Sequence, residues 1–181
     1  MNVIFKRNSL CILSLITNIS KGENMTKPIQ KQKFVGMEAP AVKLTMINDE
    51  TKVIGMMAEK IQVMITLPSA KDLNDEILAI INKHQEKSFI YIISPEKIDR
   101  GVDNSMITMD CEKFSLKYGV FMPESGCAKS IFIINKEGEI VYRELVVDKD
   151  ELLNTQAFDE ALAEAIAFKA KGHTHENWMS V

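Results

Sequence analysis

The sequence is poor in cysteine and has no large excess of charge of either sign. Only three of its 181 residues are cysteines, Cys11, Cys111 and Cys127. So few cysteines, and an odd number of them, exclude a disulfide framework and favour a reducing compartment. The formal net charge of -3 argues against a nucleic-acid-binding surface or a polybasic membrane patch. No apolar run reaches the roughly 18 residues of a membrane-spanning helix.

The composition is otherwise that of one globular domain. Hydrophobic residues make up 46% of the chain, which is enough for a core of ordinary size. We find no internal repeat and no linker. We predict a lead-in over residues 25–35, a domain over residues 36–170 and a polar tail over residues 171–181.

Residues 1–24 allow two interpretations. A basic pair precedes the apolar stretch Leu10–Ile16, as in a short signal peptide, but Asn18–Ser20 is a poor cleavage site. Lys21–Glu23, shortly before Met25, back-translates to a purine run of the kind found in a ribosome-binding site. We therefore predict that translation begins at Met25 and that the protein is cytoplasmic. Export, with residues 1–20 acting as a signal, is the alternative.

Hydrophobic periodicity predicts alternating strands and helices. Nearly continuous apolar runs, typical of strands buried on both faces, lie at Ile61–Leu67, Phe89–Ile93 and Ser130–Ile134. Further strands are expected at Val42–Met46, Met106–Met109 and Glu139–Val147, and helices at Asp72–Gln85, Glu112–Tyr118 and Phe158–Phe168. Asp72 is the expected N-cap of the first helix. This order predicts an α/β fold with a mixed central sheet flanked by helices, of the thioredoxin-like kind.

Four segments between about residues 35 and 170 carry a shared set of motifs. Val35–Pro40 has the pattern Val-Gly-x-x-Ala-Pro, and Phe114–Val120 has the pattern Phe-x-x-x-Tyr-Gly-Val. Ala128–Tyr142 forms a strand and hairpin, and Phe158–Leu162 begins the last helix. In order and spacing they resemble the bacterial thiol peroxidases, the atypical two-cysteine peroxiredoxins of the redoxin family. The resemblance implies a peroxiredoxin fold and thioredoxin-dependent peroxide reduction.

The catalytic positions depart from this family. The family's active loop reads Pro, three residues, Thr, two residues, Cys, and an arginine assists the cysteine. Pro68 is present here, but Asp72 occupies the threonine position, Asp75 the cysteine position and Lys129 the arginine position. The segment after Ser94 also lacks the resolving cysteine. Since a carboxylate cannot form a sulfenic acid and lysine lacks the bidentate fork of arginine, we predict a pseudoenzyme.

Two thiols remain inside the domain. A helix N-terminus lowers the pKa of a cysteine, but Asp110 and Glu112 flank Cys111 and raise it. Cys127 comes two residues before Lys129, near the former active site. Taken one at a time, each cysteine fits a structural role better than a redox role.

Other polar groups give weaker signals. Asp72 and Asp75 could form an acid pair, but their spacing suits helix capping better. His173 and His175 resemble a metal clip, yet they lie in the polar tail, where adventitious metal or none is expected. We expect neither a cofactor nor a metal ion.

Three functions are open. The first is a non-catalytic peroxiredoxin-like protein with a binding or regulatory role, acting as a homodimer. The second is an oxidoreductase that uses Cys111 or Cys127, with a thioredoxin-like partner. The third is a chaperone-like or ligand-binding module built on the emptied pocket around Pro68, Asp75 and Lys129. The first hypothesis agrees best with the altered motif.

Overall fold

A computed structural model describes residues 31–168 of the chain. Cys11, the predicted start at Met25, and the His173 and His175 pair lie outside the described residues. Within the described range no helix combines the length and the apolar character needed to cross a bilayer.

Five strands form a mixed sheet in the order β5-β4-β3-β6-β7. Their bounds are β3 Ile61–Thr66, β4 Ser88–Ile93, β5 Ile107–Thr108, β6 Lys129–Ile134 and β7 Ile140–Val146. The central strand β3 pairs in parallel with β4 and antiparallel with β6. Every residue of β3 and β6 is buried, which explains their continuous apolar runs. The predicted mixed sheet, with Ile61–Leu67 at its centre, is confirmed.

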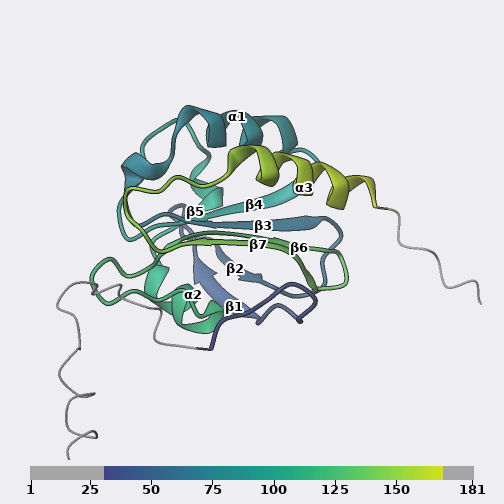
Figure 1. The fold of residues 1–181 in the computed structure, drawn as a ribbon, viewed down its shortest axis with the longest axis horizontal. Helices are drawn as coiled ribbons and strands as arrows, with labels where there is room; N and C mark the ends of the chain where they lie inside the picture. Colours follow the sequence, from purple (N-terminus) through teal and green to yellow (C-terminus); the bar gives the residue numbers. More distant parts are fainter. Residues whose placement is uncertain (1–30, 169–181) are drawn as a thin grey trace, which may run out of the picture.

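Helices and a hairpin cover the two faces of this sheet (Figure 1). Helices α1 (Asp75–His84) and α3 (Thr155–Ala167) lie on one face. Helix α2 (Cys111–Tyr118) and the hairpin of β1 (Val42–Thr45) with β2 (Thr51–Ile54) lie on the other. Alternate residues of β3 serve the two sides: Val63 and Ile65 join the cluster under α1 and α3, and Met64 joins the cluster at α2.

Two boundaries show where local sequence signals were sufficient and where they were not. Gly119 ends α2 with a φ of 72°, as predicted, and a Cβ there would approach the Lys31 carbonyl oxygen to 2.5 Å. The strand β2 was missed. Of its four residues only Ile54 is buried, so Thr51–Ile54 has no apolar alternation from which a strand could be predicted.

The two helices on one face are joined by a polar contact at their edge. His84 Nε2 lies 2.8 Å from Asp159 Oδ1, and Lys83 Nζ donates to Asp159 Oδ2 at 2.7 Å. Hydrogen bonds from Lys83 and then from His84 lower the pKa of Asp159. The carboxylate therefore helps to hold α3 against α1.

We expect Asp159→Asn to lower the free energy of unfolding near neutral pH by about 1 kcal/mol. Because the pKa of Asp159 is lower in the folded chain, its contribution is complete above the unfolded-state pKa of about 3.9 and is lost as pH falls through the folded-state pKa. Urea unfolding of both proteins from pH 7 down to pH 3 measures this. A stability gap that stays constant over that range would contradict the role of the charge.

Candidate functional site

Hydrogen bonds hold the loop after β3 in one conformation. The 3-10 helix η1 (Ala70–Asp72) has Ser69 as its N-cap, and the Ser69 N–H donates to Asp72 Oδ2 at 3.1 Å. Glu96 Oε2 accepts from Ser69 Oγ at 2.9 Å and from the Ala70 N–H at 2.8 Å, and these bonds, the backbone one foremost, lower the pKa of Glu96. The loop N–H groups that could bind a ligand are thus occupied.

Helix α1 begins later than the sequence predicted. Its N-cap is Asn74, whose Oδ1 accepts from the Ile77 N–H at 2.8 Å. The prediction of Asp72 as the N-cap was therefore wrong, because Asp72 belongs to the preceding turn. Asp75 lies in the first turn of α1, as predicted.

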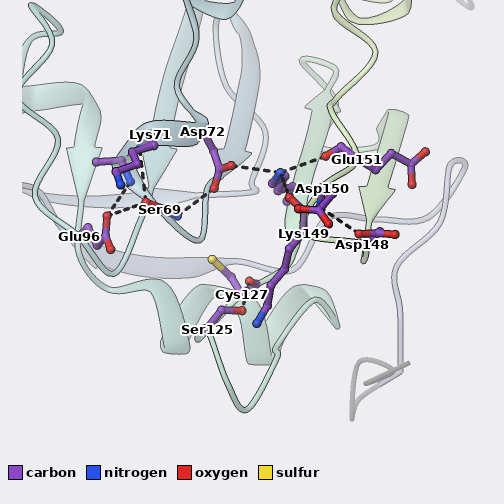
Figure 2. A network of polar contacts seen from close by, with 12 residues as sticks. Ser69, Lys71, Asp72, Glu96, Ser125, Cys127, Asp148, Lys149, Asp150 and Glu151 are labelled. Carbon is purple, nitrogen blue, oxygen red and sulfur yellow. Dashed lines mark hydrogen bonds and ion pairs between the residues drawn. The ribbon is translucent and has the colours of Figure 1, made fainter. Parts of the chain in front are cut away.

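Lys129 is buried at the start of β6, with only 7% of its side chain exposed. Its ammonium lies 3.1 Å from Asp72 Oδ1 and donates to the carbonyl oxygens of Lys149 at 2.7 Å and Glu151 at 3.0 Å. Figure 2 shows Asp72 directed toward the segment that contains these two carbonyls. An ammonium has three hydrogens to donate, so the three acceptors account for all of them.

Asp75 takes no part in this cluster. Its side chain is 93% exposed, and its ion pair is with Arg100 at 3.6 Å. The grouping of Pro68, Asp75 and Lys129 expected from the resemblance is therefore corrected: Asp72, at the threonine position, is the carboxylate that meets Lys129. Asp72 is the last residue of the turn η1 and is directed inward, whereas Asp75 is the first residue of α1.

The space around Pro68 and Lys129 is nearly filled. A cavity of about 30 Å³ remains, lined among others by Pro68, Ser125, Cys127 and Lys129. Sites for organic ligands usually measure about 300 Å³ or more. This cavity is too small for them, which argues against the hypothesis of a ligand-binding module at this place.

The thiols Cys111 and Cys127 lie in the same buried cluster, although no sequence pattern indicated that they form a pair. Both are free and buried in the cluster between α2 and the sheet. A hydrogen bond from the Cys127 thiol lowers the pKa of Cys111, against the effect of burial. Asp110, expected to raise that pKa, instead accepts from the Thr45 N–H at 2.8 Å. The interpretation of two isolated structural thiols was incomplete.

The sequence contained no local signal for this contact. Cys111 begins α2, and Cys127 precedes β6 in an irregular segment. Both positions face the same cluster only because α2 packs beneath the strands. The proximity of Cys111 and Cys127 could be predicted only by packing α2 against the predicted sheet. The charges that flank each cysteine do not indicate it.

A larger hollow of about 360 Å³ lies at the other end of β6, between the β6–β7 turn and α3. Its lining includes Ile61, Lys136, Val141, Ala165 and Phe168. Among the described residues that line it there is no cysteine or histidine. Over residues 31–168 we also find no group of three or more side chains suited to hold a metal ion.

Comparison with known proteins agrees with this architecture. No family model matches the chain. A thiol peroxidase from Aquifex aeolicus (strain VF5) is 27% identical over 155 residues, which cover 71% of this chain and 84% of that protein. A peroxiredoxin-like protein from Aquifex aeolicus superposes with a TM-score of 0.60 and 22% identity, over 76% of this chain and 90% of that one. The chain has a peroxiredoxin fold.

Further solved structures extend the likeness. A thiol peroxidase from Chromobacterium violaceum gives a TM-score of 0.60 at 16% identity, covering 75% of this chain and 89% of its own. AhpC from Mycobacterium bovis gives 0.58 at 16% identity, covering 83% of this chain and all of its own. These neighbours share their fold with this chain.

Proposed function

We propose that this chain is a thiol peroxidase-like protein without peroxidase activity at the loop after β3, and that it has a binding or regulatory role. The observation that carries the proposal is the Lys129 cluster. Peroxide reduction in this family requires a thiolate beside free donors that stabilise the transferring oxygens. All three ammonium hydrogens of Lys129 are directed at acceptors within the chain.

The carboxylates of Asp72 and Asp75 also support the proposal. Asp75 at the cysteine position supplies no thiolate, and its exposed carboxylate pairs with Arg100. Asp72 at the threonine position neutralises Lys129. The two groups at the positions of the family's reactive residues thus form ion pairs within the chain and supply no thiolate at this loop.

A second candidate is an oxidoreductase based on Cys111 or Cys127. The contact between the two thiols favours it. In that case the reductant would be a thioredoxin-like partner. As to assembly and location, we propose a homodimer in the cytoplasm.

We expect no catalytic turnover of hydrogen peroxide, because the loop lacks a thiolate. The assay couples thioredoxin, thioredoxin reductase and NADPH, and uses the Aquifex aeolicus thiol peroxidase as a positive control. The wild type is compared with a variant that carries Cys111→Ser and Cys127→Ser. Turnover that disappears in this variant would replace the first proposal by the second.

A further inference from the structure

The two buried thiols differ from an ordinary pair of core cysteines in their contacts. Cys111 is 2% exposed and Cys127 is fully buried. Both belong to the same buried cluster, and the Ser115 hydroxyl lies 3.8 Å from Cys111 Sγ. A Cβ added at Gly126 would lie 3.8 Å from the same sulfur, so the backbone next to Cys127 approaches Cys111. The two cysteines are therefore neighbours in the core.

The pKa values of the two thiols are shifted in opposite directions. The hydrogen bond from Cys127 lowers the pKa of Cys111, and Ser115 contributes in the same direction. The pKa of Cys127 is raised by this bond, by burial and by the charges of Cys111 and Asp72. The pair therefore loses one proton far more readily than two, and a single thiolate is held between two sulfurs.

The cavity of about 30 Å³ described above adjoins this pair. Cys127 lines that cavity together with Pro68 and Lys129, and Figure 2 shows the Cys127 side chain below Asp72. A water molecule needs a cavity of about 10–15 Å³. The space thus suits a molecule the size of hydrogen peroxide and excludes bulky organic hydroperoxides.

We propose that Cys111 and Cys127 are a redox-sensitive pair that hydrogen peroxide converts to an intramolecular disulfide. This inference rests on the regulatory role proposed above and names hydrogen peroxide as the stimulus to which the protein responds. It requires one oxidation event per molecule and no catalytic turnover.

The reaction balances with hydrogen peroxide as the oxidant. The Cys111 thiolate attacks one peroxide oxygen, the O–O bond breaks, and the hydroxide released takes up a proton to give water. The Cys127 thiol then attacks the sulfenic sulfur of Cys111, its proton leaves with the hydroxyl group as a second water, and the S–S bond forms. Two thiols and one peroxide thus give one disulfide and two waters.

Disulfide formation is expected to change an exposed segment through Lys129. Formation of the bond draws Cys127 toward α2, and Cys127 is joined through Ala128 to Lys129. Lys129 holds the carbonyls of Lys149 and Glu151, and both residues are exposed. Oxidation is therefore expected to loosen the segment of residues 148–151.

The test uses the full chain with Cys11→Ser, so that only the two thiols of interest are present. The protein is treated with a small excess of hydrogen peroxide, denatured and alkylated, and its intact mass is measured. We expect no alkylated thiol after oxidation and two after reduction with dithiothreitol. Tryptic digestion should join the peptides of residues 101–113 and 118–129.

Two further variants in this background, Cys111→Ala and Cys127→Ala, serve as matched controls and should form no internal bond. Hydrogen exchange of the oxidised and reduced forms should differ at residues 148–151. Two thiols still alkylated after oxidation, sulfinic acid without a bond, or a bond only between chains would each overturn the inference. The peroxide turnover assay is independent, so disulfide formation without turnover supports both proposals, and turnover with no internal disulfide refutes both.

Discussion

Asp72→Ala is expected to lower the free energy of unfolding by about 3 kcal/mol, because removal of one partner leaves the other charge buried without compensation. Asp72 and Lys129 have 20% and 7% of their side chains exposed. The substitution also removes the acceptor for the Ser69 N–H. Urea unfolding of the wild type and the variant at pH 7 measures the loss.

Asp75→Ala is the matched control, three residues along the same loop. Its side chain is 93% exposed and its ion pair with Arg100 spans 3.6 Å, so we expect a change within about 0.5 kcal/mol. Asp72→Asn, which keeps an acceptor for the Ser69 N–H but not the charge, should fall between the two. Equal losses for Asp72→Ala and Asp75→Ala would contradict the assignment of Asp72 as the partner of Lys129.

The combined substitution Asp72→Thr, Asp75→Cys and Lys129→Arg is expected to gain measurable peroxide consumption with dithiothreitol as the reductant. It introduces a thiol at the start of α1, removes the carboxylate at position 72 and provides a guanidinium with additional donors. Asp75→Cys alone should be less active by roughly tenfold or more, because one pKa unit changes the thiolate fraction about tenfold.

This experiment separates the new thiol from those already present. The chain with Asp72→Thr, Asp75→Ser and Lys129→Arg retains Cys111 and Cys127 and measures the peroxide consumption of these two thiols, which the triple variant that carries Asp75→Cys should exceed. Circular dichroism of each variant shows whether the sheet and helices have formed. If Asp75→Cys alone were as active as the triple variant, positions 72 and 129 would not contribute to the proposed loss of peroxidase activity.

The sheet could be predicted because its strands carry strong local signals. Ile61–Leu67 and Ser130–Ile134 are buried on both faces, and no exposed residue interrupts their apolar runs. The strand β2 could not, because its burial depends on Ile54 alone. Where a single side chain is buried, neither alternation nor a continuous run appears in the sequence.

The site was predicted in part. The motif placed Pro68, Asp72, Asp75 and Lys129 at one end of the central strands. The structure brings Asp72 and Lys129 together, but Asp75 lies apart from Lys129 and pairs with Arg100. Sequence alignment could not show which aspartate points inward, because the turn η1 decides this through the Ser69 and Asp72 hydrogen bonds. The contact of Cys111 with Cys127 depends on how α2 docks on the sheet, which no local pattern reports.

The caps of the loop after β3 restrict the conformational movement of the start of α1. In a two-cysteine enzyme, a thiol at the start of α1 must meet its partner thiol in every cycle, which requires local unfolding. Residues that must move are kept at marginal stability. If Asp75 stands at the position of that thiol, as the resemblance implies, the caps at Ser69 and Asn74 hold the start of α1 in one conformation without opposing a catalytic movement.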